Sequence, residues 1–285
     1  MRKGLLYASL AIFSAYVSAG AILWAAQTHL IFEPLRTLVV APAELGFPVA
    51  DITIPVRGET LHAWWMSGSR ADDKLILYFH GNDGNVSTSV SKTALLRELG
   101  FAVLAVDYRG YGESDGKFPS EASVYEDAEA ALAALLGWQK DPRDIYVYGH
   151  SLGAAIAIDL ATRHPELGGL IVEGGFTSIY DMARLEPRYG MYPVGLLLNQ
   201  RFDSISKVSR LELPVLYIHG TADEVVPYEM GEALYERSGG RKRFVPVRGG
   251  GHDDNAAVAP AVLRAAILEL TQASRSLEME HAGAE

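Results

Sequence analysis

The sequence predicts an α/β fold with a mostly parallel central sheet, helices on both faces and a small inserted cap. Two observations lead to this prediction. Short apolar runs, typical of strands buried on both faces, alternate along the chain with longer segments of helical periodicity. One of these runs ends at a glycine and continues directly as a helix, with a serine at the corner, in the pentapeptide Gly-His-Ser-Leu-Gly at residues 149–153. The 285 residues suffice for one such domain plus an appendage.

The chain begins with an apolar segment that is long enough to cross a membrane. Residues 4–26 contain no charged side chain, and about 20 apolar residues span the hydrocarbon core. Because Arg2 and Lys3 precede this segment, the positive-inside rule puts the following domain on the extracytoplasmic side. We therefore expect residues 1–30 to be a single-pass transmembrane anchor. Small residues just before Gly20 favour the alternative, a cleaved signal peptide and a secreted or periplasmic domain.

The main domain is expected over residues 31–272, and its first part is a proline-containing connector. The segments after the connector alternate like an antiparallel hairpin at the edge of the sheet, and the next apolar runs are typical of central parallel strands joined by a crossover helix. These expected elements are the hairpin strands 52–54 and 61–65, the central strands 74–79 and 101–106, and the helix 87–99.

Strands and helices continue to alternate to the end of the domain, which implies right-handed crossovers and a sheet covered on both faces. The expected elements are a helix at 120–136, a strand from 145 to the corner serine, a helix up to Arg163, strands at 169–173, 215–219 and 243–247, and helices at 230–237 and 260–270. Residues 273–285 are polar and lack periodicity, so we expect an unstructured tail there.

Composition argues against several classes of function. The chain has 25 basic and 35 acidic residues and a net charge of -10, so it lacks the basic excess with which proteins neutralise nucleic-acid phosphates. It has no cysteine, and therefore neither a disulfide framework nor a thiolate metal site. No expected element carries two histidines at metal-ligand spacing, so we expect no metal and no other cofactor.

Ser151 is the expected nucleophile. Gly149 and Gly153 remove the side chains that would collide in a sharp strand-to-helix turn, where the serine takes a strained conformation and its hydroxyl stands clear of the sheet. A serine hydroxyl is a poor nucleophile unless a base takes its proton and a third group holds that base in the right tautomer. The site therefore also needs a histidine and a carboxylate.

Asp223 and His252 are the expected partners of this serine, because each follows a later strand in the order serine, acid, histidine. His252 lies on a glycine-rich loop, which can bring an imidazole over the serine. Glu173, at the end of the strand before them, is the alternative acid. Three other histidines near the same sheet edge are expected to bond backbone groups: His80, His150 and His219.

The tetrahedral intermediate of such a reaction needs hydrogen-bond donors for its negatively charged oxygen. The loop of residues 80–85 is rich in glycine and asparagine and follows the first central strand, where a donor loop belongs. The helix after the serine begins with Leu152. We therefore predict an oxyanion hole formed by the backbone N–H groups of Asn82 and Leu152.

A cap is expected at about residues 177–211, where an apolar segment interrupts the alternation of strands and helices. Its side chains Met182, Tyr189, Met191 and Tyr192 are predicted to bind the acyl part of a substrate. In the alternative, the segment is a helix that simply packs on the sheet, since a stripe of Leu and Met is more often core than pocket.

Five motifs carry a resemblance to a known family. They are His-Gly-Asn at 80–82, Asp-Tyr-Arg-Gly-Tyr-Gly-Glu-Ser at 107–114, Gly-His-Ser-Leu-Gly at 149–153, His-Gly-Thr-Ala-Asp-Glu-Val-Val-Pro at 219–227 and Gly-His at 251–252. In this order they resemble the α/β-hydrolase superfamily, and more narrowly its membrane-anchored ABHD and Bem46-like branch, which includes lysophospholipid lipases, monoacylglycerol lipases and protein depalmitoylases. The resemblance implies Ser151, Asp223 and His252 as a catalytic triad, and Asp107 with Arg109 as structural support.

These features together predict a membrane-anchored serine hydrolase that needs no cofactor. It is expected to cleave a small-molecule ester or thioester of lipid-like or acylated character through an acyl-enzyme. Related folds also cleave amides, so an aminopeptidase-like serine peptidase is the closest alternative, and a short-chain esterase is another. Outside enzymes, the alternative is a catalytically silent binding protein that kept the fold, which would fail to react with a fluorophosphonate.

Overall fold

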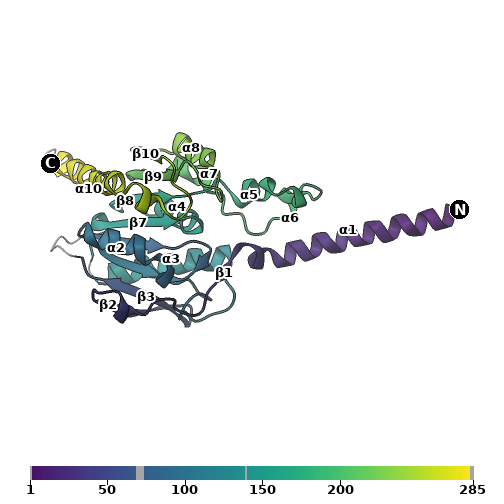
Figure 1. The fold of residues 1–285 in the computed structure, drawn as a ribbon, viewed down its shortest axis with the longest axis horizontal. Helices are drawn as coiled ribbons and strands as arrows, with labels where there is room; N and C mark the ends of the chain where they lie inside the picture. The colour runs from purple at the N-terminus through teal and green to yellow at the C-terminus, as the bar shows by residue number, and fades with distance from the viewer. Residues whose placement is uncertain (1, 69–73, 139, 283–285) are drawn as a thin grey trace.

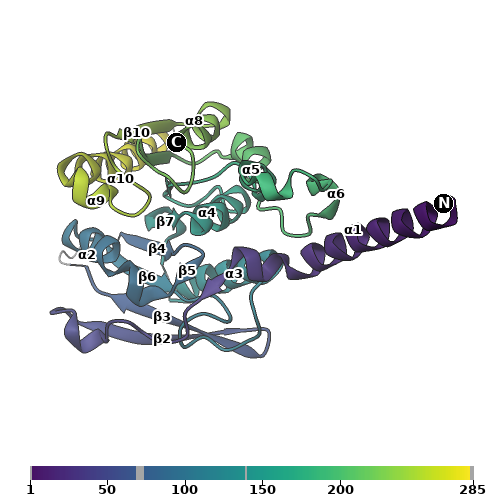
Figure 2. The same cartoon turned by 45° about the vertical axis from the view of Figure 1, so that its right-hand side comes forward.

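The sheet at the centre of the molecule runs in the order β10-β9-β8-β7-β4-β6-β3-β2 (Figures 1 and 2). The computed structural model describes residues 2–68, 74–138 and 140–282, and within these residues the sheet has eight strands. They are β2 (Val49–Val56), β3 (Glu59–Met66), β4 (Leu75–Phe79), β6 (Ala102–Val106), β7 (Ile145–His150), β8 (Gly169–Glu173), β9 (Val215–Gly220) and β10 (Lys242–Val247). Neighbours from β10 to β6 are parallel, whereas β3 is antiparallel to both β6 and β2. The predicted α/β architecture with a mostly parallel sheet is therefore present.

β2 and β3 form the expected hairpin. Arg57 (φ 47°) and Gly58 (φ 83°) at its turn are both left-handed, as a two-residue turn that follows the twist of the strands requires. The expectation that both strands lie at the edge is right for β2 and wrong for β3, which pairs with β6 on its other side. Residues 61–64 of β3 are all buried, as an inner strand requires.

Helices cover both faces of the sheet. One face packs against α3 (Glu121–Gly137), α4 (Leu152–Arg163) and α8 (Tyr228–Arg237), and the other against α2 (Val90–Glu98), α9 (Asn255–Val258) and α10 (Pro260–Ala282). The side chains of β4 alternate between the two cores, with Leu75, Leu77 and Phe79 in the first and Ile76 and Tyr78 in the second. This alternation explains why the strand is a continuous apolar run in the sequence.

α10 is longer than expected. The helix continues to Ala282, whereas we predicted an unstructured tail from Ala273. No glycine or proline interrupts residues 261–282, and the alanine, leucine and glutamate in this stretch favour a helix. The last residues of the predicted tail, 283–285, lie outside the described part of the chain.

α1 (Arg2–Ile31) is one continuous helix that projects from the body of the molecule (Figures 1 and 2). By length and composition it could cross a membrane, with a mean hydropathy of 1.7 in its most apolar window. Most of its side chains are exposed, but Gly20 and Gln27 are buried. The carboxyl-terminal half of α1 therefore contacts the rest of the molecule.

The segment between β8 and β9 is where we expect the cap. It contains the short helices α5 (Ile179–Leu185), α6 (Val194–Leu197) and α7 (Ser204–Lys207). Phe202 and Val208, around α7, belong to the first core. α5 and α6 instead stand away from the sheet, on the side from which α1 projects (Figures 1 and 2). The part of the segment that can shape a pocket is therefore the stretch up to Leu198.

Candidate active site

Ser151 lies at the sharp turn between β7 and α4. Its backbone has φ 53° and ψ −117°, a conformation that non-glycine residues rarely adopt. A Cβ on Gly149 would lie 2.2 Å from the carbonyl oxygen of Gly153, and a Cβ on Gly153 would lie 2.2 Å from that of Phe79. Both positions therefore require glycine. The N–H of Ser151 donates to the carbonyl of Glu173 (2.9 Å), which helps to hold the strained residue in place.

Asp223 contacts the imidazole of His252, with 2.8 Å between Oδ2 and Nδ1. The same oxygen lies 3.3 Å from Nε2 of His219, and Oδ1 accepts from the backbone N–H groups of Val225 (2.9 Å) and Val226 (2.8 Å). Burial alone would raise the pKa of Asp223, but these hydrogen bonds and the nearby imidazole charge hold it well below its usual value. Asp223 is therefore an ionised carboxylate that holds one nitrogen of His252.

Glu173, the alternative acid, has other partners. Its Oε2 is 3.0 Å from Nζ of Lys92 and accepts from the hydroxyl of Tyr148 (2.6 Å), and its Oε1 accepts from the side-chain amide of Asn255 (3.1 Å). Burial would raise the pKa of Glu173, but the positive charge of Lys92 lowers it to about 2. The fully buried carboxylate of Glu173 is thus engaged by three donors. Asp223, and not Glu173, contacts His252.

The three other histidines of this sheet edge bond backbone carbonyls, as expected. His80 contacts the carbonyl of Gly81 (2.9 Å), His150 that of His252 (3.0 Å) and His219 that of Val226 (3.0 Å). Burial and then the charge of Lys92 lower the pKa of His150 to about 3, so its ring is neutral and Nε2 donates its proton to the carbonyl. His150 therefore fixes the backbone of the loop that carries His252.

The loop after β4 lies against Ser151. A Cβ on Gly81 would lie 3.5 Å from Cβ of Ser151. The tyrosines of the 107–114 motif hold this loop, because Tyr108 donates to the carbonyl of His80 (2.8 Å) and Tyr111 to that of Asn82 (2.6 Å). Asn82 and Leu152, the predicted oxyanion donors, line the same pocket as Ser151. Leu152 is also the first residue of α4, where backbone N–H groups are free of helical partners and carry positive partial charge.

Asp107 and Arg109 make structural contacts. Asp107 bonds Nδ1 of His62 (3.0 Å) and accepts from the N–H of Val86 (2.8 Å), which ties β6 to the start of the crossover segment. Arg109 bonds the buried carboxylate of Asp127 on α3 (2.6 Å). These contacts agree with the supporting role that the resemblance implies.

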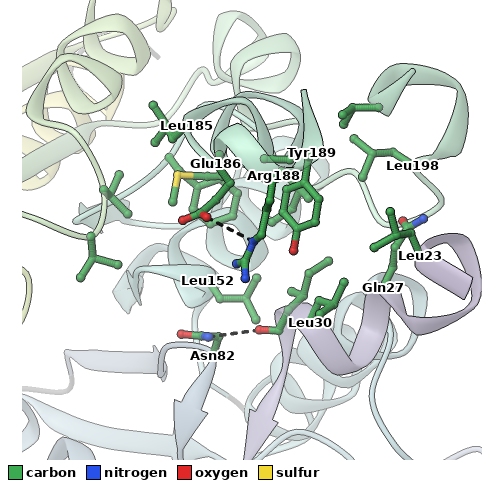
Figure 3. Close-up of a pocket in the computed structure, with 18 of the residues that line it drawn as sticks. Leu23, Gln27, Leu30, Asn82, Leu152, Leu185, Glu186, Arg188, Tyr189 and Leu198 are labelled. Carbon is green, nitrogen blue, oxygen red and sulfur yellow. Dashed lines mark hydrogen bonds and ion pairs between the residues drawn. The ribbon is translucent and has the colours of Figure 1, made fainter. Parts of the chain in front are cut away.

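A pocket of about 530 Å³ opens at Ser151. Figure 3 shows part of its lining, with Asn82 and Leu152 labelled. Its walls come from four parts of the chain: α1, the turns around Ser151 and Asn82, the segment 176–198, and the loop after Asp223. Apolar side chains dominate its lining, among them Leu23, Leu30, Phe176, Ile179, Met182, Leu185, Val194, Leu197, Leu198 and Val225. Glu186, Arg188 and Glu224 are its charged members, and the first two form an ion pair (3.2 Å; Figure 3).

Three of the four predicted acyl-binding residues line this pocket: Met182, Tyr189 and Tyr192. Met191 does not, because its side chain is 69% exposed and only its carbonyl is engaged, by the hydroxyl of Tyr16 (2.8 Å). The segment around Met191 is irregular, so no periodicity in the sequence indicates which side chains turn inward.

Sequence reasoning missed the contribution of α1. Leu23, Gln27 and Leu30 line the pocket (Figure 3). Ile31, the last residue of the helix, lines it as well. The carbonyl of Ile31 also accepts from the side-chain amide of Asn82 (3.1 Å), and the short strand β1 (Glu33–Pro34) pairs in parallel with β5 (Asp83–Gly84) in the loop after β4. The one signal in the sequence is Gln27, a polar residue directly after the apolar run.

Among the residues that the structure describes, no group of three or more His, Cys, Asp or Glu side chains is placed to hold a metal ion.

Comparisons with known proteins bear on this site. A family model described as serine aminopeptidase, S33, matches residues 70–200. An uncharacterized protein of Mycobacterium tuberculosis is 34% identical over 245 residues, which cover 84% of this chain and 86% of that protein. The alpha/beta hydrolase domain-containing protein WAV2 of Arabidopsis thaliana is 31% identical over 267 residues, with 85% of this chain and 86% of that protein covered.

Two further similarities extend the comparison. Lysophosphatidylserine lipase ABHD12 of Danio rerio is 32% identical over 210 residues, and the match spans 64% of this chain and about half (54%) of the lipase. Among solved structures, an esterase of Pyrococcus furiosus superposes with a TM-score of 0.70 at 22% identity, over 85% of this chain and 97% of the esterase. This likeness confirms the predicted fold class.

Proposed function

This chain belongs to the α/β-hydrolase family and is a hydrolase, and from that premise we propose that it cleaves carboxylic ester or thioester bonds of lipid-like or acylated substrates. The observation that supports this proposal most directly is the location of Ser151 in the wall of a mainly apolar pocket of about 530 Å³. A pocket of this size is typical of small-molecule sites, and its apolar walls suit an acyl chain. The lipase named among the relatives acts on a lipid, which agrees with this choice of substrate.

In the proposed reaction, Oγ of Ser151 attacks the carbonyl carbon while Nε2 of His252 takes the hydroxyl proton. The carbonyl oxygen becomes an oxyanion, which receives hydrogen bonds from the backbone N–H groups of Asn82 and Leu152. The intermediate collapses when His252 returns the proton to the leaving alkoxide or thiolate. Water, deprotonated by His252, then attacks the acyl-enzyme and releases the carboxylic acid and free Ser151.

Asp223 has an electrostatic role in this reaction. Its contact with Nδ1 of His252 selects the tautomer in which Nε2 is free to accept the serine proton. The depressed pKa of Asp223 keeps it ionised at neutral pH, so its charge stabilises the imidazolium that forms when Ser151 attacks. His219 and the backbone donors fix the carboxylate, which keeps this charge in place.

We propose that α1 anchors this hydrolase in the membrane, with the catalytic body on the extracytoplasmic side. The length and apolar composition of α1 support the anchor, and Arg2 and Lys3 before the apolar run support the orientation. Cleavage before Gly20 and release of the domain is the alternative. Both arrangements retain Leu23, Gln27 and Leu30 in the pocket.

Hydrolysis of p-nitrophenyl esters from acetate to palmitate tests the acyl specificity. Each buried methylene is worth about 0.8 kcal/mol, so kcat/KM should rise severalfold for each added pair of carbons until the pocket is filled. Ser151→Ala is the matched control for spontaneous and contaminating hydrolysis. A flat series, or one that falls after butyrate, would replace the lipid proposal by a short-chain esterase.

A serine aminopeptidase is the second candidate, because the matching family model carries that description and because an acidic side chain, Glu224, lines the pocket. A carboxylate there could bind the ammonium group of a peptide amino terminus. Aminoacyl p-nitroanilides distinguish the two activities. If the unaltered protein releases p-nitroaniline and both Ser151→Ala and Glu224→Gln lose this activity, the peptidase is favoured. If Glu224→Gln still hydrolyses esters, the esterase or lipase is favoured.

A further inference from the structure

α1 is attached to the segment 189–198 along one face. The hydroxyl of Tyr16 donates to the carbonyl of Met191 (2.8 Å), and the rings of Tyr16 and Tyr192 stack with centroids 5.1 Å apart. One turn later, Gly20 is buried beneath Tyr192, where an added Cβ would lie 3.9 Å from the ring. These contacts recur at the spacing of one helix face.

The same face continues to Gln27, which closes the attachment. Its Nε2 donates to the carbonyl of Leu197 (2.7 Å), and its Oε1 accepts from the N–H groups of Asn199 (2.8 Å) and Gln200 (3.2 Å). The side-chain amide of Asn199 in turn donates to the carbonyl of Trp24 (2.9 Å). The helix and the segment are thus joined over about three turns.

The part of the apolar run before these contacts is too short to cross a membrane. Residues 4–15 extend about 18 Å as a helix, whereas the hydrocarbon core is about 30 Å thick. Even the shortest spanning helices, of about 17 residues, would reach from Gly4 to Gly20. If α1 crosses the membrane, the turns that carry Tyr16 and Gly20 must therefore lie in hydrocarbon, and Met191 and Tyr192 lie there with them.

The segment itself is suited to that environment. Residues 189–198, Tyr-Gly-Met-Tyr-Pro-Val-Gly-Leu-Leu-Leu, carry no charge, and the nearest charged residues are Arg188 before them and Arg201 after them. Met191 and Leu196 turn outward, with exposed fractions of 69% and 86%. Arginines at the two ends can reach the head groups while apolar side chains between them meet the acyl chains.

The backbone of the segment also meets the requirement of a lipid environment, where unbonded polar groups are costly. Its turns bond internally, for example from the N–H of Leu197 to the carbonyl of Pro193 (3.2 Å) and from that of Leu198 to Val194 (3.0 Å). The carbonyls of Met191 and Leu197 accept from side chains of α1.

We infer that residues 189–198 insert into the lipid leaflet beside α1, and that the pocket at Ser151 receives its substrate from this leaflet. The inference rests on the proposed membrane anchor. Leu23, Gln27 and Leu30 of α1 line the pocket together with Tyr192, Val194 and Leu197 of the segment. A bilayer lipid that enters the pocket beside this joint reaches Ser151 with its acyl chain already among apolar side chains.

Site-specific fluorescence tests the insertion on the full-length protein. The chain has no cysteine, so Leu196→Cys can be labelled with an environment-sensitive dye at that position alone. Val262→Cys on α10, an apolar residue that is 49% exposed, is the matched control, and Phe13→Cys, 66% exposed on α1, is the reference for the anchor. Each protein is reconstituted in phosphatidylcholine vesicles that contain doxyl-labelled phosphatidylcholine as the quencher.

Quenching by the doxyl lipid at Leu196→Cys and Phe13→Cys, but not at Val262→Cys, is the expected result. Quenching at Phe13→Cys alone would overturn the insertion and leave the anchor intact. Quenching at neither position would overturn the anchor as well. Protection of Leu196→Cys from aqueous iodide without lipid quenching would show that a second copy of the chain covers the segment, which also overturns the inference.

A charge at the tip of the segment tests the source of the substrate. Leu196 does not line the pocket, so Leu196→Glu should hydrolyse soluble p-nitrophenyl butyrate at a rate within about twofold of the unaltered protein. Because a carboxylate resists burial in lipid, the same variant should hydrolyse vesicle-embedded p-nitrophenyl palmitate about tenfold more slowly, or slower still. Val262→Glu should change neither rate. Equal rates for Leu196→Glu and Val262→Glu on the embedded ester would contradict delivery from the leaflet.

Discussion

Replacing Lys92 by methionine should destabilise the whole domain, because it leaves a buried carboxylate without its counter-charge. Lys92 on α2 and Glu173 at the end of β8 are 3.0 Å apart, and their exposed fractions are 6% and 0%. Tyr148 and Asn255 also bond Glu173, but both are neutral donors. After the substitution, Glu173 must either stay ionised without a cation or take up a proton.

The size of the effect follows from the pKa of Glu173. Although burial would raise it, the charge of Lys92 lowers this pKa to about 2, against an ordinary value of 4.5. That difference corresponds to roughly 3 kcal/mol of folding free energy at neutral pH, and breaking buried pairs typically costs about 3–5 kcal/mol. For a domain of this size, about 3 kcal/mol lowers Tm by roughly 6 °C or more.

The assay is thermal unfolding of the full-length protein in detergent, followed by near-ultraviolet circular dichroism, in a double-mutant cycle. Glu173→Gln should also destabilise, because it leaves Lys92 charged and buried. The double variant, with neither charge, should recover much of the loss and give a coupling of about 2–3 kcal/mol. Arg264→Met is the control, since its partially exposed pair with Glu98 joins α10 to α2 and should contribute less than about 1 kcal/mol.

The pH dependence supplies a second readout of the same pair. The folded-state pKa of Glu173 lies below its unfolded value, so its stabilisation is complete above about pH 4.5 and is lost as the pH falls towards 2. Glu173→Gln should remove this part of the acid sensitivity. Additive effects in the cycle, or a Lys92→Met protein as stable as the unaltered one, would refute the reasoning.

Other predictions concern the triad, the histidine loop and the anchor. Ser151→Ala should lower kcat by about 10³-fold or more without unfolding, and Asp223→Asn by a similar factor; near-normal turnover in either, measured with p-nitrophenyl esters, would refute the assignment. Gly174→Ala should lower kcat in the same assay with little change in KM. Gly174 has φ 57°, and an added Cβ would lie 3.1 Å from Cε1 of His252. An unchanged kcat would contradict this. α1 should keep the protein in the membrane fraction through a carbonate wash, and a soluble mature protein that begins at Gly20 would show cleavage instead.

Local pattern sufficed for the sheet and for the turn at Ser151. Parallel strands that are buried on both faces are continuous apolar runs, and each lies within a residue or two of its expected position. The turn at Ser151 was predictable because its two glycines are required by contacts within a few residues and with the adjacent strand. Added Cβ atoms at Gly149 and Gly153 would each come within 2.2 Å of a carbonyl oxygen. The 2.8 Å contact between Asp223 and His252 was expected from the order of the strands.

The pocket could be predicted only in part, because its walls depend on contacts between distant parts of the chain. Gln27 and Leu197 are 170 residues apart, and no periodicity in either segment specifies that they meet. Met191 lies outside the pocket lining for a related reason, since an irregular segment has no fixed inward face. The inner position of β3 depends likewise on its pairing with β6, about 40 residues further along the chain.

The bond from Asn82 to the carbonyl of Ile31 has a practical consequence for protein production. A truncated protein that starts after α1 would be the obvious choice for soluble expression and crystallisation. Such a protein would lack Leu23, Gln27 and Leu30 from the pocket and would release Asn82 from the helix end. Low turnover by the shortened protein would then report a damaged site rather than the wrong substrate, so expression trials should keep the chain from Gly20 onward and shield its apolar face with detergent or a nanodisc.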